Sequence, residues 1–327
     1  MSKFVAIYYR NCKEYVGGSG RLRRLATCLK IDVIDCPIVN NRISRNIFFY
    51  LFQSIIISFI TLKHLKSIIN NQVIIYQPLS LPAGIFVVLT KILKGEKVIL
   101  DDFNLHGWSE YIPYKLFAKS VKEIWTSSLY TIITIRKILG RDIEIKYVPV
   151  PLYIRSCTSS DKQNIILYVA SKSFKRYIDI GREVCKLAEI FSNYLFLIIG
   201  SICEELKKDS NCIKRNIILL GHVPDVVYEK LLERAKYLIV FDTVPYIYKG
   251  GMPIKLVDAI EHCVIPIISY QYRYNFPFIN FVYSFEELRE AILKGVSMDF
   301  VFLGRIYSCS QIRKTVYKRV CNISPSV

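Results

Sequence analysis

The amino-acid sequence predicts an α/β protein made of two doubly wound halves. Short apolar runs of strand type alternate with helical patterns along almost the whole chain, which is typical of parallel sheets covered by helices. A polar, Ser/Thr-rich segment at residues 155–163 interrupts the alternation, and the same pattern then starts again. The 327 residues, 52% of them hydrophobic, suffice for two medium domains. We therefore expect one domain at 1–154, a second at 164–305, and a C-terminal helix at 306–327 that could cross back to the first.

The first half is expected to hold six strands and five helices. The strands are predicted at residues 3–9, 31–36, 73–77, 97–101, 123–126 and 144–148, and the helices at 21–30, 46–69, 83–93, 114–122 and 129–139. A loop of Gly17, Gly18, Ser19 and Gly20 is predicted ahead of the first helix. This loop either faces a ligand or is simply a tight turn that needs glycine.

The second half repeats the arrangement. Strands are predicted at 164–169, 195–199, 216–220, 238–241 and 264–269, and helices at 178–191, 203–208, 226–235, 253–262, 286–293 and 310–319. A loop with three basic residues, Lys172, Lys175 and Arg176, follows the first of these strands. The three residues either bind an anion or form a solvated face of the loop.

The stretch 238–269 carries the clearest chemical signal. It predicts a strand, a loop ending in Gly250-Gly251-Met252, a helix opened by Pro253, and a second buried strand. A glycine loop that leads into a helix exposes backbone N–H groups at the positive end of the helix dipole, which suits phosphate. Asp258 lies farther along this helix, where its carboxylate could accept two hydrogen bonds from a ribose. The alternative is an ordinary crossover with glycines for the turn.

Polar residues follow the strand at 97–101. Asp101, Asp102, Asn104 and His106 are the best acid/base candidates in the first half, because open parallel sheets place their ligands at the carboxyl ends of strands. The alternative is that Asp or Asn side chains here cap a helix.

The formal charge of +18 favours an anionic partner, such as a nucleic acid, a lipid surface or a phosphorylated substrate. The basic residues form no long tract and no recognised nucleic-acid module, so we expect no nucleic-acid partner and keep a basic nucleic-acid-binding protein as a third hypothesis. The apolar segment 46–62 falls short of the ~20 residues that a bilayer needs. It is interpreted first as a buried crossover helix. The second interpretation is an interfacial face, beside Arg42, Arg45, Lys63 and Lys66, at an anionic membrane.

The ten cysteines lack the spacing of a metal site, since no Cys-x-x-Cys pair occurs. Many lie in apolar periodic runs, as Cys185 and Cys263 do. We interpret most of them as small buried side chains in a reducing compartment, and leave a disulfide or two open. No signal peptide precedes the first strand, so we expect a cytoplasmic protein.

Taken together, these motifs resemble the GT-B glycosyltransferases, especially the group 1 (family 4) type. The resemblance covers nearly the full length and is carried by Gly17–Arg21 with its helix, residues 77–101, the basic loop after 164–169, residues 216–224 and the Pro-x-Lys-Leu-x-Asp pattern at 253–258. The form MPIKLVDAIEHCVIPI is also similar to the dolichol-pathway β-mannosyltransferases. The resemblance implies two Rossmann-like doubly wound domains facing a central cleft, with acceptor binding in the first and nucleotide-sugar binding in the second.

The resemblance also implies roles for single residues. Asp258 would bind the donor ribose, and the basic residues of the loop, with Lys255, would lie at the donor diphosphate. Gly250, Gly251 and Met252 would supply backbone near the sugar and phosphates, and His222 and Val223 would lie beside the base. A loop of the first domain, with Gly18, Ser19 and Gly20, would face the phosphates. The site would need no metal and no cofactor besides the donor, because cations and N–H dipoles stabilise the departing diphosphate.

The sequence departs from the family pattern in two places. The first Glu of the family's E-x7-E motif would fall at Gly250, and the family's histidine would fall near Phe103, with His106 a few residues later. Asp101, Asp102 and His106 remain the candidates for the catalytic base, and the resemblance leaves retention or inversion of configuration open. We therefore expect a hexosyltransferase that uses a UDP- or GDP-sugar and a hydroxyl on a glycan, lipid or protein. The alternative is a catalytically degenerate GT-B homologue that binds nucleotide or glycan.

Overall fold

The computed structural model of the chain divides into two compact units. Unit 1 consists of Met1–Pro151, Tyr248–Gly251 and Tyr307–Val327, and unit 2 of Leu152–Ile247 and Met252–Ile306. The structure describes residues 4–8, 17–35, 59, 63–76, 81–95, 97–101, 115–117, 120–139, 143–154, 162–170, 175–241, 254–269 and 281–317.

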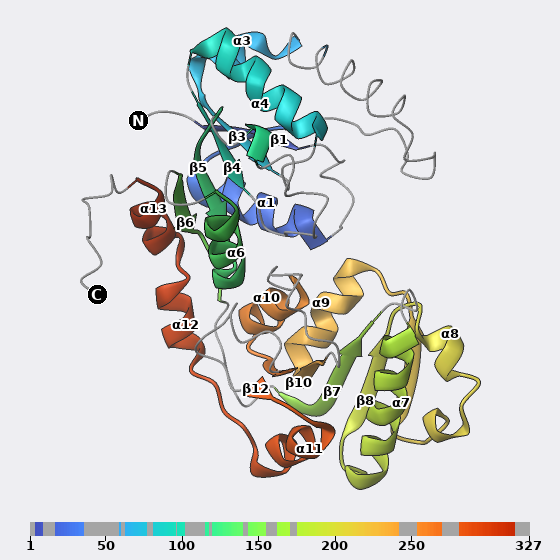
Figure 1. The fold of residues 1–327 in the computed structure, drawn as a ribbon. Coiled ribbons are helices and arrows are strands. Elements are labelled where there is room, and N and C mark those ends of the chain that lie inside the picture. Colours follow the sequence, from blue (N-terminus) through green and yellow to red (C-terminus); the bar gives the residue numbers. More distant parts are fainter. Residues whose placement is uncertain are drawn as a thin grey trace. The chain divides into compact units, whose positions relative to one another are not determined.

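Unit 1 is built on a parallel sheet of six strands in the order β2-β1-β3-β4-β5-β6 (Figure 1). The strands are β1 (Phe4–Tyr8), β2 (Asp32–Asp35), β3 (Gln72–Tyr76), β4 (Val98–Asp101), β5 (Val121–Thr126) and β6 (Glu144–Tyr147). The helices are α1 (Gly17–Leu29), α3 (Leu65–Asn70), α4 (Leu81–Lys94), α6 (Leu129–Leu139) and α13 (Cys309–Tyr317). From β1 the chain first adds β2 on one side and then β3 to β6 on the other, so the strand order reverses between β1 and β3.

The two faces of this sheet are buried in separate clusters, because successive strand side chains point to opposite faces. Val73 and Ile75 of β3 belong to the cluster that includes residues of α3, α4 and α6. Ile74 lies between them in the sequence and belongs to the other cluster, with residues of α1 and α13. The sheet is therefore covered by helices on both faces, as its near-continuous apolar strands predict.

Unit 2 repeats the plan with a second parallel sheet, in the order β12-β11-β10-β7-β8-β9. Its strands are β7 (Gln163–Val169), β8 (Leu195–Ile199), β9 (Ile217–Gly221), β10 (Ala235–Val240), β11 (Ile265–Ser269) and β12 (Phe281–Val282). Its helices are α7 (Lys175–Ile190), α8 (Cys203–Leu206), a 3-10 turn at Ser210–Cys212, α9 (Asp225–Arg234), α10 (Ile254–Glu261), α11 (Phe285–Lys294) and α12 (Phe300–Ile306).

A half-buried lysine links two helices of unit 2. The ammonium of Lys162 donates to the carbonyl oxygens of Leu232 (2.9 Å), Glu233 (3.0 Å) and His262 (2.6 Å). The last carbonyls of a helix have no partner within the helix, and a cation at that end also suits the helix dipole. Lys162 thus satisfies the ends of α9 and α10 from a position just before β7.

Most predicted elements are present, with bounds shifted by a few residues. The helix predicted at 178–191 begins three residues earlier, and residues 121–122 are the start of β5 rather than the end of a helix. Gly17 to Gly20 were expected to form a loop, but they make up the first turn of α1. The helix α12 and the strand β12 were not predicted. Of the long helix expected at 46–69, the structure describes only Phe59 and 63–69. None of the described helices combines the length and apolar character needed to cross a membrane.

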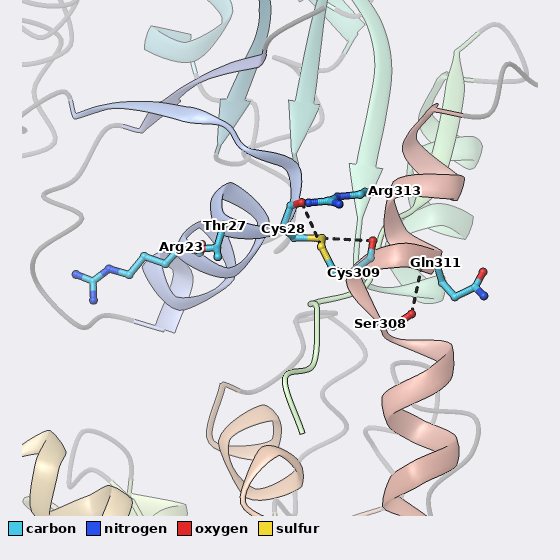
Figure 2. The surroundings of a disulfide bond; sticks show 7 residues. All are labelled: Arg23, Thr27, Cys28, Ser308, Cys309, Gln311 and Arg313. Atoms are coloured by element: carbon cyan, nitrogen blue, oxygen red, sulfur yellow. Dashed lines mark hydrogen bonds between the residues drawn. A yellow bond between two sulfur atoms is a disulfide. The ribbon is translucent and has the colours of Figure 1, made fainter. Parts of the chain in front are cut away.

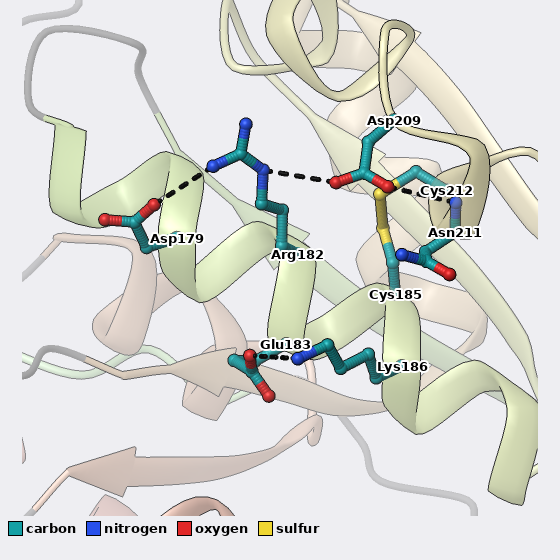
Figure 3. Close-up of polar contacts among 8 residues, drawn as sticks. All are labelled: Asp179, Arg182, Glu183, Cys185, Lys186, Asp209, Asn211 and Cys212. Carbon is teal, nitrogen blue, oxygen red and sulfur yellow. Dashed lines mark hydrogen bonds and ion pairs between the residues drawn. A yellow bond between two sulfur atoms is a disulfide. The ribbon is translucent and has the colours of Figure 1, made fainter.

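The prediction that most cysteines are free thiols is wrong for the described part of the chain. Cys28 is disulfide-bonded to Cys309, which fastens α1 to α13 across 281 residues (Figure 2). Within unit 2, Cys185 of α7 is bonded to Cys212, beside an ion pair of Arg182 and Asp209 (Figure 3). The remaining described cysteines are Cys263, which is also disulfide-bonded, and Cys203, a buried free thiol.

These bonds join cysteines that are far apart in the sequence, so no spacing rule could reveal them. Disulfides persist mainly in oxidising compartments. The disulfides therefore do not support the expectation of a reducing compartment.

Candidate functional site

The strand order of unit 2 marks the place where a ligand is expected. From β7 the chain proceeds to β8 and β9 on one side, whereas from β10 it proceeds to β11 and β12 on the other. The neighbouring strands β7 and β10 therefore flank the topological switch point of this sheet. Open α/β sheets bind ligands outside the carboxyl ends of the strands at this point.

Helices α7 and α10, which follow the two strands at the switch point, differ from the other helices of unit 2 in the charges at their starts. The first turns of α8, α9 and α11 contain acidic residues, and Asp299 accepts a hydrogen bond from the backbone N–H of Phe302 at the start of α12. Such carboxylates stabilise the positive end of a helix dipole. The first turns of α7 and α10 contain no acid. The first turn of α7 contains Lys175 and Arg176, and that of α10 contains Lys255. These two helix starts thus combine cations with the positive ends of dipoles, an arrangement that suits a bound anion.

The side chains at these helix starts are not equally exposed. Lys175 is exposed. Arg176 is half-buried, with its guanidinium carbon 4.9 Å from the centre of the Tyr177 ring. The ammonium of Lys255 donates to the main-chain oxygen of Val169 at the end of β7, at 3.0 Å. This bond shows that the first turn of α10 lies at the carboxyl end of β7.

Asp258 lies on a helix that is buried on all sides. It is 6% exposed, and every residue from Leu256 to Val264 is also buried. The main-chain oxygen of Asp258 accepts a hydrogen bond from Nδ1 of His262 at 2.8 Å, which assigns the ring proton to Nδ1 because a carbonyl can only accept. The role of Asp258 as the ribose-binding residue stays a prediction.

Glycine is required at one position of this edge. Gly200, after β8, has a φ of +111°, and a Cβ added to it would lie 2.1 Å from the main-chain oxygen of Ala170. The N–H of Gly200 donates to Gly221 at 2.6 Å, and the N–H of Ala170 donates to Ile199 at 3.0 Å. The turns after β7, β8 and β9 are thus joined through their backbones into one continuous edge.

We expect Gly200→Ala to lower the free energy of unfolding by about 2–3 kcal/mol, because the side chain requires both a strained φ and a displacement of the β7 turn. Urea unfolding followed by circular dichroism would measure the change. Gly221→Ala is the matched control. Its φ is also positive, at +69°, but no atom lies within 4 Å of an added Cβ. An equal loss in the two variants would show that the contact with Ala170 is unimportant.

His222 and Val223, predicted beside the base, follow β9 at the edge of the sheet. His222 is exposed and Val223 is half-buried. The strand β8 separates them from β7, and neighbouring strands lie about 4.8 Å apart, so they are roughly 10 Å from the switch point.

In unit 1, the carboxylate of Asp101 forms an ion pair with a buried arginine. Arg21, in the second turn of α1, donates from Nη2 to Oδ1 at 2.7 Å and from Nε to Oδ2 at 3.2 Å. Arg21 is 2% exposed and Asp101 is 1% exposed. Burial raises the pKa of Asp101, while the charge and hydrogen bonds of Arg21 act in the opposite direction. The pair fixes the first turns of α1 to the carboxyl end of β4, and the role of Asp101 as a base stays a prediction.

Two tyrosines extend this buried network. The side chain of Tyr147, at the end of β6, is hydrogen-bonded to that of Tyr307. Burial raises the pKa of Tyr147, and the nearby charge of Arg21 lowers it to a lesser extent. Tyr307 precedes α13, so the network connects α1, β4, β6 and the returning C-terminal segment. Arg21 was predicted only as part of a motif, and neither tyrosine was predicted. Arg21 and Asp101 are 80 residues apart in the sequence, and Tyr147 and Tyr307 are about 160 apart.

The remaining predicted site residues lie outside the described part of the chain or are described only in part. Lys172, Asp102, His106, Gly250, Gly251 and Met252 lie outside it, and Gly18, Ser19 and Gly20 are described only as backbone of α1. The described residues contain no group of three or more His, Cys, Asp and Glu that could hold a metal ion. The expectation of a metal-independent site is not tested by this observation.

The sequence matches no family model and no curated protein. Solved structures nevertheless share its fold. The lipopolysaccharide outer core galactosyltransferase WaaB aligns with a TM-score of 0.62 at 13% identity, over 96% of this chain and 99% of that chain. TarM from S. aureus, in a complex with fondaparinux, α-GlcNAc-glycerol and UDP, aligns with a TM-score of 0.60 at 16% identity, over 81% of this chain. The alignment covers 58% of the TarM chain.

An enzyme class other than the glycosyltransferases also shares this fold. A predicted UDP-N-acetylglucosamine 2-epimerase from Listeria monocytogenes aligns with a TM-score of 0.57 at 8% identity, over 95% of this chain and 91% of that chain. At such identities the comparisons establish the architecture and not the reaction. Two six-stranded parallel sheets with flanking helices, together with these similarities, show that the chain has the GT-B fold of two Rossmann-like domains.

Proposed function

We propose that this chain is a glycosyltransferase that moves a sugar from a UDP- or GDP-sugar to a hydroxyl group on a glycan, lipid or protein. The observation that carries the proposal is the charge pattern at the switch point of unit 2. Lys175, Arg176 and Lys255 occupy the starts of α7 and α10, whose first turns contain no acidic residue. Sugar transfer develops negative charge on the departing diphosphate, and fixed cations and N–H dipoles stabilise it without a metal.

The solved structures with the same fold support a nucleotide-sugar donor. The TarM structure contains UDP, and an E. coli structure of similar fold, with a TM-score of 0.62 at 9% identity over 96% of both chains, contains UDP-2-fluoroglucose. In our proposal Asp258 binds the ribose, and Lys172 joins the cations at the diphosphate. Because both oxygens of Asp101 accept from Arg21, we assign the catalytic base to Asp102 or His106.

A thermal-shift assay with a panel of UDP- and GDP-sugars tests donor binding. A ligand at a hundredfold excess over its dissociation constant stabilises the folded protein by about 2.7 kcal/mol, which raises the melting temperature by several degrees. We expect one donor class to produce this shift, and Asp258→Asn to abolish it. Asp225→Asn, in the first turn of α9, is the matched control and should keep the shift. A panel without any shift would refute the proposal.

Two observations favour a second candidate, a GT-B homologue that binds the donor without transferring the sugar. Gly250 stands where the family has its first Glu, and Asp101 is engaged by Arg21. This candidate predicts a donor-induced thermal shift without release of UDP or GDP in the presence of acceptor glycans or lipids. Release that depends on an acceptor would exclude it.

A further inference from the structure

The positive charge of the chain is concentrated in unit 1. Unit 1 contains 26 Lys and Arg against 10 Asp and Glu, a net charge of +16, whereas unit 2 contains 19 against 17, a net charge of +2. Together these counts give the 45 basic and 27 acidic residues of the whole chain. The cations predicted to bind the donor belong to unit 2, so donor binding does not account for the excess. A charge imbalance of this size attracts an anionic partner to unit 1.

The ends of α3 and α4 lie together at the amino edge of the unit 1 sheet. Helix α3 leads into β3 and helix α4 leads into β4, and these two strands are parallel neighbours. The side-chain amide of Gln72, at the start of β3, donates to the main-chain oxygen of Lys97, just before β4, at 3.3 Å. We call six residues of these two adjacent helices and of the segment before β4 the α3–α4 patch: Lys66, Ile69, Lys91, Ile92, Leu93 and Lys97.

Three large aliphatic side chains of the patch face solvent. Ile92 is 72% exposed, Ile69 is 45% exposed and Leu93 is 44% exposed. Single exposed aliphatic residues are common on protein surfaces, and three on two adjacent helices offer apolar side chains to a partner.

The lysines of the same patch are not neutralised by described acids. Lys66 and Lys97 are exposed and Lys91 is half-buried, and none of the three forms an ion pair with a described residue. Lys91 also suits the negative end of the α4 dipole, but this explanation does not extend to Lys66, in the first turn of α3, or to Lys97, which follows the helix. Glu96 lies outside the described residues.

We propose that the α3–α4 patch docks unit 1 on an anionic lipid surface. The lysines would approach the phosphate groups of the lipids while Ile69, Ile92 and Leu93 enter the boundary between headgroups and acyl chains, which is how basic amphipathic surfaces bind membranes. A soluble polyanion would engage the lysines but would leave the aliphatic side chains in water. The combination of the two kinds of side chain therefore favours a lipid surface as the partner.

Vesicle flotation with the full chain tests the proposal. We expect binding to phosphatidylcholine vesicles that contain about 30% phosphatidylglycerol, weaker binding to phosphatidylcholine alone, and loss of binding as salt rises from about 0.1 M to about 0.5 M. Each lysine near such a surface contributes about fivefold in affinity, so Lys66→Gln with Lys97→Gln should weaken binding about 25-fold. Ile92→Asn with Leu93→Asn should weaken it at unchanged charge.

Unit 2 supplies the matched controls. The control variant carries Val226→Asn and Lys230→Gln, both on α9. Val226 is 68% exposed and Lys230 is also exposed, and this variant should bind vesicles like the unchanged chain. Equal binding by the patch variants and this control would overturn the proposal. Binding of soluble polyphosphate, with no binding to vesicles, would overturn it in favour of a polyanion. The donor-induced thermal shift is measured in parallel, so a failure of vesicle binding is distinguished from a failure of the proposed function.

Discussion

Replacing both Cys28 and Cys309 with serine should lower the free energy of unfolding by about 5 kcal/mol. The bond closes a loop with a sequence separation of 281 residues, and the loop-closure model assigns a larger stabilisation to longer loops. All of unit 2 lies within this loop, so the bond constrains nearly the whole unfolded chain. Guanidinium unfolding of the oxidised wild type and the double variant measures the difference.

The second disulfide provides the control. Cys185 and Cys212 are separated by 27 residues, so their double serine variant should lose about 3.5 kcal/mol. The folded contacts of α13 should survive the loss of Cys28–Cys309 in part, because Ile312 and Val316 remain buried against the unit 1 core. Reductant that leaves the unfolding midpoint of the wild type unchanged would contradict the stabilising role of both bonds.

The second large effect is expected at the buried ion pair of unit 1. Arg21→Met should destabilise the protein by about 3–5 kcal/mol, because it leaves the carboxylate of Asp101 buried without its counter-charge. The double variant Arg21→Met/Asp101→Leu should recover most of this loss, since an apolar pair of similar volume often replaces a buried ion pair at little cost. Urea unfolding of Arg21→Met, Asp101→Leu and the double variant completes a double-mutant cycle for the pair.

The loss in Arg21→Met should depend on pH. Burial already raises the pKa of Asp101 above its ordinary value of 3.8, and removal of Arg21 raises it further. A carboxyl with a raised pKa in the folded state favours folding when protonated, so the variant should be most stable relative to wild type at acidic pH and should lose stability as pH rises above about 4. A loss that is independent of pH would show that Asp101 is not the group left uncompensated.

The sheets of both units could be predicted from the sequence because their strands are apolar on both faces. Runs such as 98–101 and 195–199 are buried along nearly their whole length. A parallel strand covered by helices on both faces is a continuous apolar run, which can be recognised without knowing which strands pair with it. Helix α12 was missed because only Leu303 of its seven residues is buried, which leaves no apolar periodicity to detect. The segment 17–20, with three glycines and a serine, was predicted as a loop because glycine opposes helix formation, but the packing of Leu22 and Leu25 extends the helix to Gly17.

The candidate site could be predicted only in part, because its geometry depends on contacts between distant residues. Lys175, Arg176 and Lys255 were selected from local motifs, and the strand order then places them at the switch point of one sheet. The engagement of Asp101 by Arg21 could not be seen, since the two are 80 residues apart and neither position is unusual by itself. Gly200 was not singled out from the sequence, because its close approach to Ala170 is a tertiary property.

Hydrogen–deuterium exchange of the full chain with and without UDP or GDP tests the central claim most directly. Our account predicts that the bound nucleotide slows amide exchange at the first turns of α7 and α10 and in the turn at Gly200, all at the carboxyl edge of the unit 2 sheet. Protection confined to unit 1, or to the amino edge of the unit 2 sheet, would contradict the assignment of the donor site.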